Sequence, residues 1–158
     1  SKGWNLTFTL FIVNDCDTQC CNKEEKNLMF TELCLSVPWG AGKGEESAAK
    51  TAAVFNQTRP ALIGSSMLTV FPSSRLFREI QAGRWREAGE LEKLRELRGL
   101  AAGLTIPTYF ATLGASNAVF AEGMLPQRRG AILAVLDEAI AAGDEAALRR
   151  YREELPHL

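Results

Sequence analysis

The chain has 158 residues, of which 46% are hydrophobic and 23% charged, and its formal net charge is -1. This length fits one domain over residues 1–158 with a substantial apolar core. The charge balance gives no electrostatic basis for binding nucleic acid or an anionic membrane, and the apolar run at 8–13 is much shorter than the ~20 residues that cross a bilayer. Since no signal-peptide pattern opens the sequence, we expect a cytoplasmic protein.

Residue patterns in the first part of the chain favour strands. β-Branched and aromatic residues predict strands at 5–15 and 28–37, and a third strand is predicted over 61–71. Alanines that recur along one face predict a helix over 45–58, which Pro60 ends. The first part is therefore expected to be strand-rich with one helix.

The second part of the chain favours helices. Helices are predicted over 73–83, 84–103, 127–143 and 144–155, because alanine, leucine, arginine and glutamate dominate and glycines mark helix ends. Segment 105–126 is apolar and rich in small residues, which is typical of either a buried strand or a short helix.

Two local features of these predicted helices bear on their packing. The pattern Leu-x-x-x-Ile-x-Ala-Gly occurs at 76–83 and again at 136–143, which predicts two helix–glycine–helix hairpins. In the helix predicted over 84–103, Arg86, Glu90 and Lys93 fall on the side away from Leu91 and Ala88.

Residue usage changes near position 70. Residues 1–70 hold five of the six lysines and one arginine, whereas residues 71–158 hold one lysine and eleven arginines. The change fits a strand-rich part joined to a helix-rich part, and it also fits a chain of mosaic or engineered origin; both explanations stay open. We expect an α+β or α/β fold in which the strand-rich part packs with C-terminal helical hairpins.

The four cysteines, Cys16, Cys20, Cys21 and Cys34, lie early in the chain and include no C-x-x-C pair. A zinc site would require all four thiolates, two of them adjacent in sequence, so we expect no bound metal and no cofactor. Free thiols are favoured over a disulfide such as Cys16 to Cys34. The single histidine, His157, lies one residue from the end of the sequence, which argues against catalysis by a histidine base.

A glycine-rich stretch between the second predicted strand and the first predicted helix has features of a phosphate-binding loop. Such loops combine glycines, a helix N-terminus and a lysine, and the candidate ligand-binding residues are Gly40, Gly42, Lys43 and Gly44. The string GAGKG resembles the phosphate loop of adenylate kinases, which implies a small anionic ligand such as a nucleotide. The full pattern has glycine in place of Val37 and a hydroxyl in place of Glu45, so a plain glycine-rich connection remains the alternative.

Residues 64–97 resemble a region of the dihydrodipicolinate synthase and N-acetylneuraminate lyase family, where a glycine-containing strand leads into Phe-Pro and a helix–glycine–helix pair. The resemblance implies a (β/α)₈ barrel with a Schiff-base lysine on a strand upstream of this region. The upstream lysines nearest to it, Lys43 and Lys50, do not lie in predicted strands. No catalytic residue is therefore transferred.

An amphipathic stripe along the C-terminal helices carries Phe77, Trp85 and several leucines. Helices with more apolar surface than one small sheet covers tend to associate. We therefore expect a soluble binding or assembly module that forms homo-oligomers through these helices. The alternatives are a phosphate- or nucleotide-binding enzyme that uses the loop at 40–44, and a lyase of the family named above, so whether the chain is an enzyme stays open.

Overall fold

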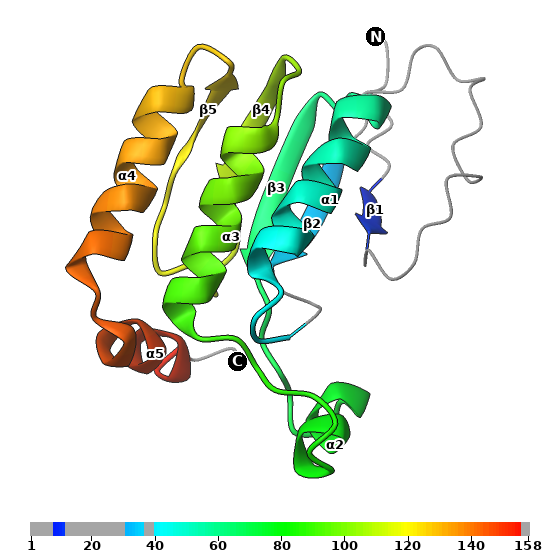
Figure 1. The fold of residues 1–158 in the computed structure, drawn as a ribbon, viewed down its shortest axis with the longest axis vertical. Helices are drawn as coiled ribbons and strands as arrows, with labels where there is room; N and C mark the ends of the chain where they lie inside the picture. The colour runs from blue at the N-terminus through cyan, green and yellow to red at the C-terminus, as the bar shows by residue number, and fades with distance from the viewer. Residues whose placement is uncertain (1–7, 12–30, 37–39, 156–158) are drawn as a thin grey trace, which may run out of the picture.

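The computed structural model describes residues 8–11, 31–36 and 40–155. These residues form a mixed α and β fold, as the sequence predicts (Figure 1). The elements in chain order are β1 (Phe8–Phe11), β2 (Thr31–Ser36), α1 (Gly44–Thr58), β3 (Leu62–Met67), α2 (Arg75–Gln81), α3 (Glu90–Gly103), β4 (Thr108–Thr112), β5 (Glu122–Leu125), α4 (Arg129–Ala142) and α5 (Glu145–Glu153).

The five strands form one sheet in the order β1-β2-β3-β4-β5. The first four strands are parallel, and β5 runs antiparallel to β4. Parallel neighbours need a crossover connection, and here α1 connects β2 to β3 while α2 and α3 connect β3 to β4. The carboxyl ends of the parallel strands therefore meet at one edge of the sheet, which we call the carboxyl edge.

Helices α1, α3 and α4 lie side by side across one face of the sheet, whereas α2 and α5 lie at the carboxyl edge (Figure 1). The main core fills the space between these three helices and the sheet. It includes Phe55, Ile63, Leu97, Phe110 and Leu136, each at most 1% exposed. A fully buried side chain of this size contributes about 1.5–3 kcal/mol through the apolar area removed from water.

Small residues bring α1 and α3 close together. A Cβ atom built on Gly99 would lie 3.1 Å from the Cβ of Ala48, and one built on Gly103 would lie 2.9 Å from the Cβ of Ala52. Neither distance leaves room for a larger residue without a shift of the backbone. The alanine-rich face of α1 therefore meets the glycines of α3, and the C-terminal turn of α3 has two positions where only glycine fits without adjustment.

The predicted elements are present with two corrections. Segment 105–126 contains the strand pair β4 and β5, so strands occur in both parts of the chain and the sheet is shared between them. The helix predicted from residue 84 begins only at Glu90, and Trp85 lies in the connection that precedes it. The reason is tertiary: the carbonyl of Arg86 accepts a hydrogen bond from the Ala41 N–H at 2.9 Å instead of joining a helix.

Candidate functional site

The four residues predicted to bind a ligand lie together at the start of α1. Gly40 and Gly42 have φ of +86° and +83°, a left-handed conformation that glycine adopts without strain. Lys43 is the N-cap residue of α1 and Gly44 is its first residue. Gly40 also permits close contact with Trp85, because a Cβ at position 40 would lie 2.9 Å from the Nε1 atom of Trp85.

The backbone donors of this loop are already engaged by a carboxylate of the same chain. The Oε1 atom of Glu92, in the first turn of α3, accepts hydrogen bonds from the N–H of Gly42 at 2.6 Å and of Gly44 at 3.4 Å. Glu92 therefore occupies the position that a phosphate oxygen would take at this helix N-terminus. Any exogenous anion at the predicted site must displace it.

The lysines beside the loop face a carboxylate as well. Lys43 lies 3.5 Å and Lys50 2.8 Å from the carboxylate of Glu46. A hydrogen bond from Lys50, followed by the charges of Lys50 and Lys43, holds the pKa of Glu46 below its usual value. With Ser47, these three residues line a shallow hollow of about 160 Å³. The hollow carries one net positive charge and is large enough for only a small ligand.

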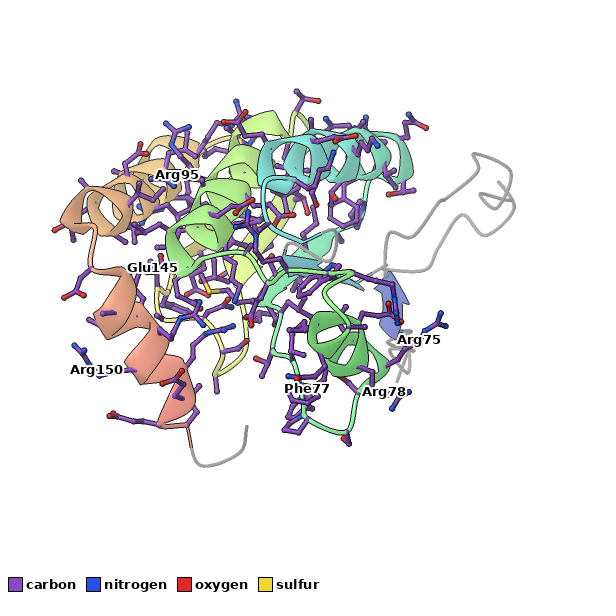
Figure 2. The ribbon with its side chains drawn as sticks, turned by 60° about the horizontal axis from the view of Figure 1, so that its bottom comes forward. Arg75, Phe77, Arg78, Arg95, Glu145 and Arg150 are labelled. Carbon is purple, nitrogen blue, oxygen red and sulfur yellow. The ribbon has the colours of Figure 1, made fainter. Side chains whose placement is uncertain are left out.

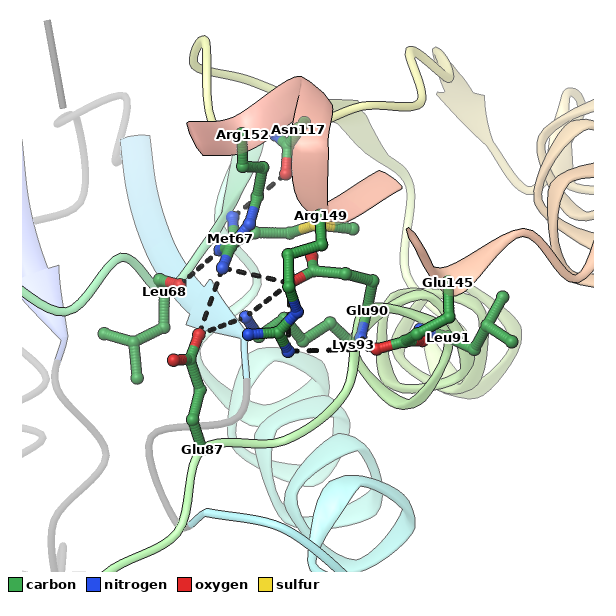
Figure 3. Close-up of polar contacts among 10 residues, drawn as sticks. All are labelled: Met67, Leu68, Glu87, Glu90, Leu91, Lys93, Asn117, Glu145, Arg149 and Arg152. Atoms are coloured by element: carbon green, nitrogen blue, oxygen red, sulfur yellow. Dashed lines mark hydrogen bonds and ion pairs between the residues drawn. The ribbon is translucent and has the colours of Figure 1, made fainter. Parts of the chain in front are cut away.

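A second group of charged residues, which the sequence analysis did not identify, lies between α3, α5 and the end of β3 (Figure 3). We call Glu87, Glu90, Lys93 and Arg152 the carboxyl-edge cluster. Lys93 is 0% exposed, and its Nζ atom lies 2.6 Å from Glu87 and 3.3 Å from Glu90. The Nη2 atom of Arg152 lies 3.0 Å from each of the same two carboxylates. The side of α3 that carries Glu90 and Lys93, away from Leu91, is therefore buried.

Further contacts attach α5 to this cluster. The carboxylate of Glu145 accepts hydrogen bonds from the N–H of Glu90 at 2.6 Å and of Leu91 at 2.9 Å, which caps the N-terminus of α3. The Nη1 atom of Arg152 donates to the carbonyl of Leu68 at 2.7 Å, just after β3. Arg149 lies 3.9 Å from both Glu90 and Glu145. The last helix is thereby connected to α3 and to the sheet.

The loop between β4 and β5 closes the same edge with an amide side chain. The Oδ1 atom of Asn117 accepts from the Met67 N–H at 2.9 Å, and its Nδ2 atom donates to the carbonyl of Ser65 at 2.8 Å. Asn117 thus makes the pair of hydrogen bonds that a neighbouring strand would make with the end of β3, and Figure 3 shows the one to Met67.

The surroundings of the carboxyl-edge cluster favour the ionised form of the Glu87 and Glu145 carboxylates. Burial raises the pKa of Glu87, but hydrogen bonds from Lys93 and Arg152 outweigh it and place that pKa below its usual value. Burial likewise raises the pKa of Glu145, and the N–H groups of Leu91 and Glu90 lower it further than burial raises it. Lys93 and Arg152 each pair with the same two carboxylates, those of Glu87 and Glu90. Such an arrangement supports structure rather than proton transfer at neutral pH.

The predictions about the cysteines and the histidine concern residues that lie mostly outside the described part of the chain. Cys16, Cys20, Cys21 and His157 lie outside the described residues, and Cys34 lies in β2. Within 8–11, 31–36 and 40–155, no group of three or more metal-ligating side chains is close enough to hold an ion. No helix in these ranges has both the length and the apolar character of a bilayer-spanning segment.

The chain was compared with known proteins in three ways. Protein-family models, curated proteins and solved structures give no match to it. Function therefore has to be argued from the contacts and surfaces of this chain alone.

Proposed function

We propose that this chain is a binding and assembly module that self-associates through residues 68–86, a segment we call the excursion. The excursion leaves the carboxyl edge after β3, forms α2 and returns at the start of α3 (Figures 1 and 2). The observation that carries the proposal is that none of the seven residues of α2 is buried. Its apolar residues Leu76, Phe77 and Ile80 are half-buried, and Phe71 nearby is 45% exposed.

A surface of this kind supports association. Leu76, Phe77 and Ile80 lie on one side of a short amphipathic helix, and contiguous apolar surface beside polar residues is typical of contact sites. The carbonyl of Phe71 accepts a hydrogen bond from the Ser74 N–H at 2.9 Å, which holds Phe71 next to the start of α2. A second copy that pairs α2 with α2 covers both apolar surfaces at once, as two-fold symmetric interfaces do.

Charge on the excursion gives a way to tell a second copy from another partner. Residues 75–86 contain four arginines and one glutamate, and Arg75 and Arg78 are exposed on α2 (Figure 2). Two copies in contact bring like charges together, so added salt should strengthen self-association. An acidic partner would bind the same surface less tightly at high salt. The sign of the salt effect therefore identifies the partner class.

The test is light scattering over a range of protein concentrations and at two ionic strengths. Self-association that increases with salt is expected for the unchanged chain, and Phe77→Asp should shift it toward monomer. Val135→Asp is the matched control, because Val135 is 40% exposed on α4, away from the excursion. A monomer at all concentrations, or an equal effect of both substitutions, would contradict the proposal. Circular dichroism shows whether each variant is folded.

A second candidate function is binding of a small anion such as a nucleotide phosphate at Gly40, Gly42, Lys43 and Gly44. It is supported by the hydrogen bonds to Glu92, because they indicate that the N–H groups of Gly42 and Gly44 can donate to a carboxylate oxygen. ATP or AMP should then raise the melting temperature through ligand linkage. Lys43→Ala should remove that gain, and Glu92→Gln should increase it by weakening the internal competitor. This function would be contradicted if neither nucleotide raised the melting temperature of the unchanged chain, of Lys43→Ala or of Glu92→Gln.

The lyase alternative remains a prediction from the resemblance of residues 64–97. In the described part of the chain, Lys93 lies on a helix and is paired with two carboxylates, whereas Lys43 and Lys50 are at the start of α1 and within it. Borohydride trapping of a keto acid on a lysine, read by mass spectrometry, tests this alternative directly.

A further inference from the structure

We propose that α5 is a displaceable latch that closes the carboxyl edge of the sheet over Lys93. The helix is attached almost entirely by polar contacts. Arg152 is its one buried residue, Leu148 is its partly buried apolar contact with the core, and Glu145 and Arg149 supply the other attachments described above. By contrast, α3 buries three leucines against the sheet and against its neighbouring helices.

This kind of attachment opens more easily than a packed helix. When α5 leaves, its charged groups regain hydrogen bonds to water, and Leu148 is the apolar residue of α5 that loses its packing against the core. A helix held by apolar packing would cost more free energy to open, because its apolar side chains would become exposed to water. The opening of α5 should therefore require less free energy than global unfolding, which is the condition for a local opening that leaves the rest of the fold intact.

The connection before α5 suits such a movement. Only Gly143 and Asp144 separate the end of α4 from the start of α5. Gly143 has φ of +67°, and a Cβ built on it would lie no closer than 3.7 Å to any atom of the described residues. Changes in the backbone angles of these two residues can move α5 without a change in α4.

Opening uncovers a specific set of groups. It frees the carboxylates of Glu87 and Glu90, which Arg152 shares with the buried Lys93. It also frees the N–H groups of Glu90 and Leu91 that Glu145 caps, and the carbonyl of Leu68. These groups lie at the carboxyl edge, the side on which parallel α/β sheets bind ligands. The latch therefore controls whether this edge is accessible. The inference concerns α5 and the carboxyl-edge cluster and does not depend on self-association through the excursion.

The test is hydrogen exchange, followed by mass spectrometry on the full chain, in Arg152→Gln and in the matched control Arg150→Gln. Arg150 lies on the same helix and is exposed (Figure 2). In Arg152→Gln, the amides of residues 145–155 and of Glu90 and Leu91 should exchange about tenfold faster, while those of β4 and α1 keep their rates. Arg150→Gln should match the unchanged chain.

A second readout follows the opening from inside the cluster. Acylation of Lys93 by an amine-reactive reagent should be slow in the unchanged chain and several-fold faster in Arg152→Gln, with the exposed Lys50 as internal reference. If Arg152→Gln does not fold, Glu145→Gln at the 41% exposed Glu145 side chain replaces it. Faster exchange throughout the sheet, or no difference from Arg150→Gln, would overturn the latch.

Discussion

Helices α2 and α4 end in the same pattern, Leu-x-x-x-Ile-x-Ala-Gly, and in both cases the glycine has a left-handed backbone, with φ of +70° at Gly83 and +67° at Gly143. Their surroundings differ. Leu136 of α4 is 0% exposed and packs in the core, whereas the corresponding Leu76 of α2 is half-buried. After Gly143 a new helix starts at once, but six residues separate Gly83 from α3.

The difference shows which properties the local pattern determines. Glycine determines where each helix ends, because it takes the left-handed position at low conformational cost. Burial is determined by what lies beside the helix. Since α4 follows the edge strand β5, it meets α3 along its length, whereas α2 leaves the sheet at the carboxyl edge and meets no helix layer (Figure 1).

The strongest test of this comparison replaces the two equivalent leucines. Leu136→Ala should lower the free energy of unfolding by about 3 kcal/mol, because it removes buried methyl groups and leaves a cavity. Leu76→Ala should cost less than about 1 kcal/mol, since Leu76 is only half-buried. Urea denaturation measures both. Equal costs would mean that α2 belongs to the core as much as α4 does.

The two glycines give the next largest effect. No atom of the described residues other than backbone would contact a new Cβ at either position within 4 Å, so alanine there is opposed only by the left-handed backbone. That strain is about 1 kcal/mol for each substitution. Gly143→Ala should lower the global free energy of unfolding by this amount. Gly83→Ala should change it much less, because α2 can relax locally.

Thermal and urea unfolding of the two glycine variants measures the loss of global stability, and hydrogen exchange measures the loss of local stability in each helix. Faster exchange confined to residues 75–82 is expected for Gly83→Ala. If Gly83→Ala instead lowers global stability as much as Gly143→Ala, then the excursion unfolds together with the core, and the contrast between the two hairpins is wrong.

Much of the fold follows from local sequence signals. Alternating and β-branched residues located β1, β2 and β3, and the Ala-Gly endings located the ends of α2 and α4. The predicted start of α3 differs from the observed one because Trp85 and Arg86 have ordinary helical propensity. In the structure they lie outside the helix, next to Gly40 and Ala41. A contact over more than forty residues leaves no trace in the local pattern.

The sites were predicted less well, for a related reason. The glycine loop was recognisable from its composition, but the carboxylate that engages it comes from Glu92, fifty residues later in the chain. For the buried cluster, helical spacing places Glu90 and Lys93 on the side away from Leu91, but it gives no sign that Glu87 and Arg152 pair with them. One available signal was that Lys93 is the only lysine among eleven arginines after position 70.

The helix caps provide a smaller test of the same comparison. Ser74 accepts a hydrogen bond from the Phe77 N–H at 3.1 Å at the start of α2, and Asp144 accepts one from the Ala147 N–H at 2.8 Å at the start of α5. Loss of either cap costs about 0.5–1 kcal/mol of helix stability. Asp144→Ala should therefore speed hydrogen exchange in α5, and Ser74→Ala should do so in α2. Asp144→Asn, which keeps an acceptor, is the control, and an equal effect of both substitutions at Asp144 would contradict the role of the hydrogen bond.

The smallest expected effect concerns the lateral contact that α4 has and α2 lacks. Arg98 on α3 forms two hydrogen bonds with Asp137 on α4, one of them at 3.1 Å. The hydrogen bond from Arg98, together with the Arg98 charge, lowers the pKa of Asp137 by more than burial raises it. Because the pKa in the folded protein is below that of the unfolded chain, this contribution to stability is present above the unfolded pKa and is lost as the pH falls through the folded pKa.

The comparable ion pair of α2 joins two residues of the excursion and does not reach another helix. Glu79 pairs with Arg84 at 2.6 Å, and that hydrogen bond lowers the pKa of Glu79 against the opposing effect of burial. Carboxyl NMR titration should show the pKa of Asp137 returning toward its usual value in Arg98→Gln, with Glu79 unchanged, and Arg84→Gln should do the reverse. The side chain of Asp137 is 50% exposed and that of Glu79 is 29% exposed, so added salt should weaken both pKa shifts. If the pKa of Asp137 stayed low in Arg98→Gln, the contact between α3 and α4 would not depend on this pair, and the difference between α2 and α4 would rest on apolar packing alone.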